Sequence, residues 1–269
     1  MAKTQLIVIG GGNMGEAILR GLLRANLLSP DSVLAVEPVG QRRQRLSQQL
    51  NLSTVADIAE APPADQYLLA VKPQQVDVVL KPLSAALPPT GALVISVAAG
   101  ISTGYLSAAL GQKARIVRTM PNTPMLVGQG CTAICRGPGA TDDDLAFAQR
   151  LFAAAGEVFM VAESAIDAVT AVSGSGPAYF FYLVEAMVAA GVAEGLDEDM
   201  ALALARQTCA GAAALLTQSG EKPADLRAKV TSPGGTTQAA IAIMDAAGVR
   251  ESLVRAVRAA AAHSRQLKR

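Results

Sequence analysis

A glycine-rich stretch directly behind an apolar run is the feature that most restricts the fold of this chain. Residues 5–9 are a strand candidate and lead straight into Gly10-Gly11-Gly12-Asn13-Met14-Gly15, after which a helical pattern begins. A strand, a G-x-G-x-x-G turn and a helix in this order are typical of a dinucleotide-binding site. Gly10 permits the tight turn, Gly12 lets the backbone approach a pyrophosphate, and Gly15 allows helix and strand to pack closely. The helix N-terminus then faces the phosphates.

An acidic residue after the next predicted strand, at 33–36, completes this motif. Glu37 stands where a carboxylate would accept hydrogen bonds from the adenosine ribose and repel a 2′-phosphate, which favours NADH. Arg42, Arg43 and Arg45 follow closely, however, and an arginine at such a turn accommodates NADPH. A solvated helix face is the alternative for these arginines. The sequence therefore predicts a dinucleotide site and leaves the choice between NADPH and NADH open.

Two different periodicities divide the chain. Through residue 162, short β-rich runs alternate with helical patterns, which indicates an α/β fold: an N-terminal Rossmann domain, residues 1–162, with a mostly parallel, doubly wound sheet. The strands are expected at 5–9, 33–36, 66–71, 93–97, 116–118, 132–135 and 158–161, and Thr141 with the three aspartates behind it predicts a helix start.

The rest of the chain, 163–269, is alanine-rich and predicts an all-α domain with helices at about 165–172, 177–194, 198–217, 222–229, 236–246 and 249–266. These helices are apolar around much of their circumference, and the stretch 179–192 carries only one charge, Glu185. Such helices must be covered all round, which so short a domain cannot do alone. We therefore expect a homo-oligomer that shares this surface.

Several later strand ends should reach the same crevice as the glycine-rich turn, because ligands of open α/β sheets bind beyond the carboxyl ends of the strands. Small residues there leave room for a ribose and a nicotinamide ring. The candidate cofactor contacts after the third and fourth of the predicted strands are Ala70, Val71, Lys72 and Pro73, and Val97, Ala98 and Ala99. Asn122, between two prolines, supplies an amide at another strand end, where a structural turn is the alternative.

Two glycine-rich stretches interrupt the helical domain. The first, Ser173-Gly174-Ser175-Gly176, precedes Pro177 at a helix start and reads equally well as a domain hinge. The second comprises Ser232, Gly234, Gly235, Thr236 and Thr237 and leads into a helix. Exposed backbone, unpaired N–H groups with a partial positive charge and two hydroxyls suit a small carboxylate, and a plain helix cap is the alternative.

Composition bears on several other classes of function. The net charge of +1 provides no overall field for nucleic acid or an anionic membrane. Three cysteines form no disulfide framework and no zinc-ligand cluster, so we predict a cytoplasmic protein without a metal site. The most apolar late stretch, 201–216, falls short of the roughly 20 residues of a membrane span. The one histidine, His263, lies among arginines and alanines, so the usual proton shuttle is missing.

Six motifs, taken together, resemble one family. They are I-G-G-G-N-M-G-E-A-I at 9–18, A-V-K-P-Q at 70–74, S-V-A-A-G at 96–100, M-P-N-T-P at 120–124, S-G-S-G-P-A-Y at 173–179 and T-S-P-G-G-T-T at 231–237. In this order they closely resemble pyrroline-5-carboxylate reductase, the last enzyme of proline biosynthesis, over nearly the whole chain.

The resemblance implies NADPH or NADH in the Rossmann domain and 1-pyrroline-5-carboxylate near a dimer interface, with L-proline as the product. In the family the helical domain interlocks two subunits, and five dimers often form a decamer. The helix start at Thr236 and Thr237 would bind the substrate carboxylate, the Thr237 hydroxyl would reach the ring nitrogen, and residues 173–176 would line the pocket. Some members carry a glutamate at the position of Gly220; here Glu221 is one residue later, so no role is assigned to it.

The lack of an evident general acid suits this reaction, because a cyclic imine arrives protonated or takes its proton from water. Two other readings remain. A β-hydroxyacid dehydrogenase shares the two-domain plan but expects a lysine early in its second domain, and 165–200 contains none. A dinucleotide-binding regulator without turnover would keep residues 10–15 but would not need the carboxylate site.

Overall fold

The computed structural model describes residues 4–269, and these divide into two compact units. Unit 1 contains the chain up to Gly174 together with residues 260–269, and unit 2 contains residues 175–259. The predicted boundary at 162/163 belongs to the sequence pattern and stays a prediction. Each unit is described below by itself.

Unit 1 is built on an eight-stranded sheet with the order β3-β2-β1-β4-β5-β6-β7-β8. The strands are β1 (Leu6–Ile9), β2 (Val33–Val36), β3 (Ser53–Val55), β4 (Gln66–Leu69), β5 (Ala92–Ser96), β6 (Ala114–Met120), β7 (Gly130–Arg136) and β8 (Gly156–Met160). All neighbours run parallel except β6 and β7. The mostly parallel, doubly wound sheet is therefore confirmed, with the added three-residue strand β3 at one edge.

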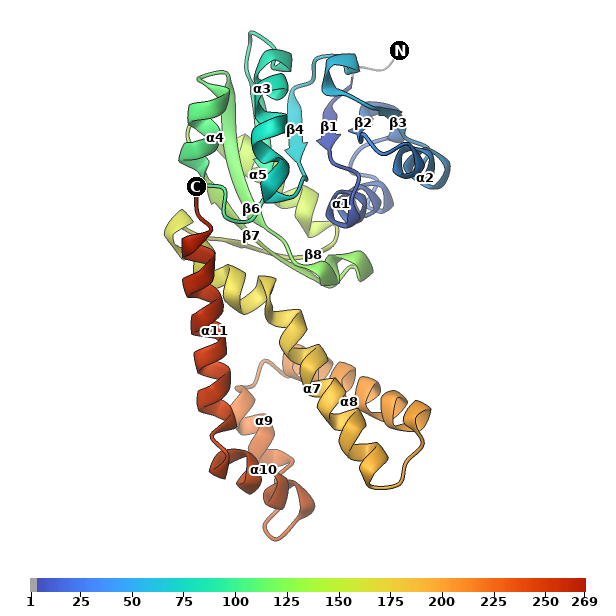
Figure 1. Ribbon diagram of the computed structural model, residues 1–269, viewed down its shortest axis with the longest axis vertical. Coiled ribbons are helices and arrows are strands. Elements are labelled where there is room, and N and C mark those ends of the chain that lie inside the picture. The colour runs from blue at the N-terminus through green and yellow to red at the C-terminus, as the bar shows by residue number, and fades with distance from the viewer. Residues whose placement is uncertain (1–3) are drawn as a thin grey trace. The chain divides into compact units, whose positions relative to one another are not determined.

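Helices cover both faces of this sheet (Figure 1). On one face α1 (Asn13–Arg24), α2 (Gly40–Leu50) and α5 (Asp142–Ala153) pack against alternate strand residues such as Leu6 and Val8. On the other, α3 (Val76–Ala86) and α4 (Thr103–Leu110) pack against Ile7 and Ile9. The strands are buried on both sides because βαβ crossovers place helices on both faces. Thr141 caps α5 as predicted, in a reciprocal capping box with Asp144.

The entry to the helical region is irregular. A short 3-10 turn at Glu163–Ala165 leads into α6 (Ile166–Val169) and then into a π-helical turn at Thr170–Gly174. The predicted regular helix at 165–172 is thus only partly right. Wider π turns are rare and occur often at functional sites, and this one contains Ser173.

Unit 2 is all helical. It contains α7 (Gly176–Ala193), α8 (Glu198–Ser219), α9 (Pro223–Lys229), α10 (Thr236–Ala246) and most of α11 (Val249–Gln266). The α7 and α8 helices leave large apolar side chains exposed, among them Phe180, Phe181 and Leu204. By length and composition, Glu163–Ala193 and Glu198–Ser219 could each cross a membrane, which the sequence analysis did not expect. Only 6% and 11% of the residues in their most apolar windows are buried, so both helices expose large apolar surfaces.

Candidate functional site

The carboxyl ends of five strands lie side by side in unit 1. Pairing places Ile9 of β1 beside Val36 of β2 and Leu69 of β4, and Leu69 beside Ser96 of β5, which in turn pairs with Arg118 of β6. The segments that leave these strands hold Gly10–Gly15, Glu37, Ala70–Pro73, Val97–Ala99 and Asn122. The structure therefore brings the predicted cofactor residues to one edge of the sheet, where open α/β sheets bind their ligands.

The glycines of the first turn are required by close contacts. A Cβ atom on Gly10, whose φ is +107°, would lie 2.5 Å from the carbonyl oxygen of Ala70, and one on Gly15 would lie 2.0 Å from that of Gly10. A Cβ on Gly12 would meet nothing within 4 Å. Gly12 precedes α1 without a side-chain cap, so the first-turn N–H groups of Asn13, Met14 and Gly15 remain for a ligand. This turn fits a pyrophosphate.

Glu37 does not project into the crevice as the sequence suggested. Its side chain is 3% exposed, and its Oε2 accepts the Gly11 N–H at 2.8 Å while its Oε1 accepts the Val39 N–H at 2.9 Å. Arg42 approaches Oε1 to 3.8 Å. The carboxylate joins the glycine-rich turn to the start of α2.

The segments after β4 and β5 are small and packed. Ala70 and Ala98 are buried, whereas Val71, Pro73, Val97 and Ala99 are half-buried and Lys72 is exposed. The turn after Ala99 is held from behind: Gly100 accepts the Arg269 N–H at 2.8 Å, and Ser102 donates its own N–H to Arg269 at 3.0 Å. No sequence pattern indicated that a residue after α11 supports this turn, because the two contacting segments are far apart in the chain.

Asn122 ties three segments together. Its Oδ1 accepts the Cys131 N–H at 2.8 Å, and its Nδ2 donates to the Ser173 carbonyl at 3.0 Å. Ser173 in turn donates its hydroxyl to Val169, and a Cβ on the neighbouring Gly174 would lie 2.7 Å from Cε of Met120. The amide that was expected to face the cofactor thus links the end of β6, β7 and the π-helical turn.

An ion pair with a buried arginine joins β6 to the turn after β8, and no sequence pattern indicated it. Arg118 is 2% exposed and donates to Oε1 of Glu163 at 2.9 Å, and Thr103 donates its N–H and hydroxyl to the same carboxylate at 2.8 and 2.6 Å. Burial alone would raise the pKa of Glu163, but these hydrogen bonds outweigh it and hold the pKa below its ordinary value. The cluster connects β6 and the start of α4 to the 3-10 turn at Glu163–Ala165, which follows β8.

In unit 2, the predicted carboxylate site is the start of α10. Gly235 precedes the helix without a side-chain cap and donates its N–H to Ser232, while Gly234, with φ +72°, donates to the side chain of Gln238. The first-turn N–H groups of Thr236 and Thr237 have no intrahelical acceptor. Thr237 is half-buried and Thr236 is exposed. Backbone donors and a hydroxyl thus converge on one helix end.

Other candidate groups lie elsewhere. Glu221 forms an ion pair with Lys229, with 2.5 Å between Oε2 and Nζ. His263 is exposed, and its Nδ1 lies 3.4 Å from Oε1 of Gln266. Burial, together with the nearby Glu163 charge, raises the pKa of Cys135 to about 11, which makes its thiol unreactive. Within residues 4–269, no three His, Cys, Asp or Glu side chains are arranged to hold a metal ion.

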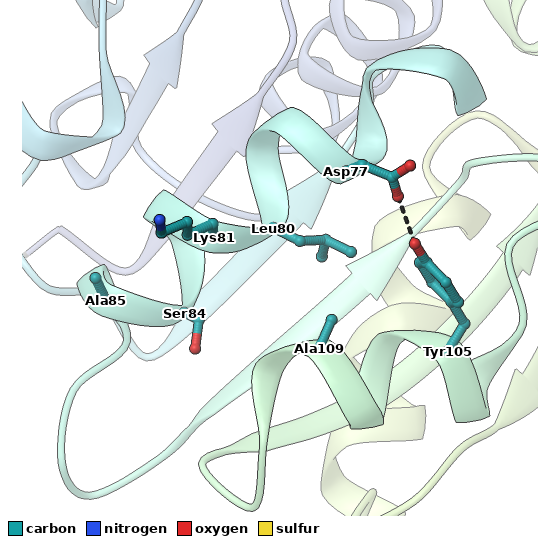
Figure 2. Close-up of a pocket in the computed structure, with 7 residues that line it drawn as sticks. All are labelled: Asp77, Leu80, Lys81, Ser84, Ala85, Tyr105 and Ala109. Atoms are coloured by element: carbon teal, nitrogen blue, oxygen red, sulfur yellow. Dashed lines mark hydrogen bonds between the residues drawn. The ribbon is translucent and has the colours of Figure 1, made fainter.

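One hollow of unit 1 has a different lining. It encloses about 440 Å³ between α3 and α4, and Figure 2 shows Asp77 pointing across it to the Tyr105 hydroxyl, at 2.5 Å. The remaining lining residues are Leu80, Lys81, Ser84, Ala85 and Ala109. It contains none of the predicted site residues.

Two parts of the chain match models of known protein families. Residues 163–267 match the family model "Pyrroline-5-carboxylate reductase dimerisation", and residues 5–100 match "NADP oxidoreductase coenzyme F420-dependent". The chain is 43% identical to a pyrroline-5-carboxylate reductase of Synechocystis, over 98% of both chains, and 38% identical to one of Arabidopsis thaliana, over 96% of this chain and 94% of the relative.

Solved structures extend the likeness to the fold. A pyrroline-5-carboxylate reductase from Coxiella burnetii is 35% identical, with a TM-score of 0.91 over all of both chains. A pyrroline carboxylate reductase from Plasmodium falciparum, solved with NADP bound, is 28% identical, with a TM-score of 0.88 over the same coverage. A chain with this dinucleotide site and helical domain, and with relatives this similar over nearly its full length, belongs to the pyrroline-5-carboxylate reductase family.

Proposed function

We propose that this reductase transfers a hydride from NADPH or NADH to the C=N carbon of 1-pyrroline-5-carboxylate and so forms L-proline. The observation that carries the assignment of the substrate end is the start of α10, an uncapped helix end with Thr236 and Thr237 beside it. A small carboxylate suits such a helix end because it meets N–H donors and a partial positive charge together. The reduced nicotinamide supplies the hydride when it is bound.

The chain's own residues then bind and orient. The Thr236 and Thr237 N–H groups hold the substrate carboxylate, and the Thr237 hydroxyl oxygen accepts the N–H of the protonated ring nitrogen, which orients the C=N bond. We further propose Ser173, Gly174, Ser175 and Gly176 as substrate contacts, and Ser232, Gly234 and Gly235 as neighbours of the carboxylate. The iminium form brings its own proton to nitrogen, so preorganised donors provide most of the rate without a histidine.

The Thr237 role is tested by a pair of substitutions. Thr237→Val keeps the shape and removes the hydroxyl, and we expect kcat/KM to fall about 10- to 100-fold, the range for one hydrogen bond to a charged group. Thr237→Ser should retain most of the activity. Thr217→Val is a matched control, because in the part of the chain that the structure describes the Thr217 hydroxyl donates within its own helix, to the Ala213 carbonyl. Equal activities of Thr237→Val and wild type would contradict the assignment.

The exposed apolar helices are explained by self-association. We infer that α7 and α8 form a homodimer interface, since the dimerisation model covers both helices and their apolar side chains lie open. A decamer of five such dimers is the further proposal, and native mass spectrometry distinguishes the two assemblies. Membrane association, the other fate of apolar helices, would appear as sedimentation with vesicles.

We also propose a cytoplasmic location. Cys131, Cys135 and Cys209 are all free thiols, which suits a reducing compartment. Fractionation of cells that express the protein tests this directly.

A further inference from the structure

At the adenosine end of the dinucleotide site, the acidic residue of the motif has a different environment from the one that the motif predicts. In that reading the acid after β2 accepts hydrogen bonds from the ribose hydroxyls. Here Glu37 is almost fully buried, and each carboxylate oxygen already accepts a backbone N–H, from Gly11 at 2.8 Å and from Val39 at 2.9 Å. A Cβ on Gly11 would lie 3.2 Å from Oε2. The carboxylate is therefore enclosed by the turn that it holds.

The negative charge of this carboxylate is also compensated. Two N–H donors point at it, and the Arg42 guanidinium lies 3.8 Å from Oε1. The first turn of α2 contains no acidic residue. A second anion close to this turn would consequently meet less repulsion than an exposed glutamate would exert.

The three arginines of α2 are not equivalent. Arg43 donates to the carbonyl oxygens of Glu37 and Pro38, at 2.8 and 2.9 Å, and Arg45 donates to Glu16 at 3.0 Å. The Arg42 side chain is 57% exposed, and its distance to Glu37 exceeds that of a hydrogen bond. Within residues 4–269, Arg42 is thus the arginine of this group that donates no side-chain hydrogen bond to the protein.

We propose that Glu37 is a positioning residue for the glycine-rich turn and that Arg42 recognises the 2′-phosphate of the adenosine ribose, so that the protein prefers NADPH to NADH. Glu37 acts on both cofactors equally, through the Gly11 backbone, whereas Arg42 acts only on the one that carries the phosphate. The inference rests on the dinucleotide site of the proposed function and assigns the determinant of cofactor choice within it.

Binding without substrate tests the proposal separately from turnover. NADPH and NADH are titrated with the assembled protein while nicotinamide fluorescence is followed, and 2′,5′-ADP and 5′-AMP compete in parallel. We expect wild type to bind NADPH and 2′,5′-ADP more tightly. Arg42→Ala should weaken NADPH about 10- to 100-fold, as for one charge-assisted hydrogen bond, and leave NADH within about twofold. Arg45→Ala, the matched control, should leave the ratio of the two dissociation constants unchanged.

Glu37→Gln separates the two possible roles of this residue by the sign of the effect. A glutamine can accept only one of the two N–H groups, so the turn loosens: both dissociation constants and both cofactor KM values should rise together, about tenfold, while kcat at saturating cofactor stays within about twofold. A ribose-binding glutamate would instead give weaker NADH and tighter NADPH binding. That result, or wild-type protein that binds NADH at least as tightly as NADPH, would overturn the proposal.

Discussion

Replacing Glu163 by glutamine should raise the population of a locally open sheet more than replacing its partner Arg118 by methionine. Arg118 is the more deeply buried member, with a side chain 3% exposed against 27% for Glu163. Glu163→Gln leaves a buried guanidinium facing a neutral amide. Removing one partner of a buried pair in this way costs about 3–5 kcal/mol, and because the glutamine oxygen still accepts one bond, we expect the lower end, about 3 kcal/mol.

Arg118→Met should be milder. Methionine fills a similar volume without a charge, and the remaining carboxylate keeps its two hydrogen bonds from Thr103 and its partial access to water. We expect about 1 kcal/mol, since replacing buried ions by apolar groups is often nearly neutral. The double substitution should then cost less than Glu163→Gln alone, because the unpaired charge has been removed.

Thiol exchange at Cys135 measures this opening. Cys135 is 1% exposed on β7 and pairs directly with Arg118 across the sheet. In a Cys131→Ser, Cys209→Ser background, its labelling rate by a disulfide reagent at fixed protomer concentration reports the population of the locally open state. A cost of about 3 kcal/mol corresponds to a rate about 100-fold higher. Labelling of Arg118→Met as fast as or faster than Glu163→Gln would refute the reasoning.

Three further outcomes are expected. Gly15→Ala should abolish binding of both cofactors, because its Cβ would lie 2.0 Å from the Gly10 carbonyl oxygen; equilibrium dialysis checks this, and unchanged affinity would contradict the turn geometry. Asn122→Ala should raise the KM for the imine more than that for the cofactor, since both ends of the Asn122 amide are bonded to the protein and one of them holds the Ser173 carbonyl. Steady-state kinetics decide between the two, and a rise confined to the cofactor KM would instead support Asn122 as a cofactor contact. The pKa values of Glu163 and Asp144 are lowered, in each case because hydrogen bonds outweigh burial. The stability that these carboxylates add to the folded protein is therefore complete above their ordinary range near pH 4 and is lost as the pH falls through the lowered values. Urea unfolding between pH 7 and 3 should show this loss, and Glu163→Gln should show less of it.

Much of the fold follows from local patterns. The helices that begin at Thr236 and Val249 start and end where periodicity and glycines place them, because caps and apolar stripes are local signals. The three-residue strand β3 has exposed and half-buried residues at a sheet edge and offers too short a period to be detected. The π-helical turn at 170–174 likewise departs from a sequence that reads as ordinary helix.

The candidate site shows where sequence reasoning stops. The glycine-rich turn was identifiable because the residues that form it are consecutive in the sequence. The orientation of the Glu37 and Asn122 side chains was not, since each is fixed by hydrogen bonds to segments up to 51 residues away. The Arg118–Glu163 pair joins residues 45 positions apart and carries no motif. Such contacts depend on tertiary packing, which a spacing rule does not contain.

Deuteride transfer tests the central claim most directly. The protein is incubated with NADPH carrying deuterium at nicotinamide C4 and with 1-pyrroline-5-carboxylate, and the product is analysed by NMR. The account predicts L-proline with one deuterium at the ring carbon next to nitrogen and away from the carboxylate, in an amount equal to the cofactor oxidised. Cofactor bound without any labelled proline, from folded protein, would contradict it.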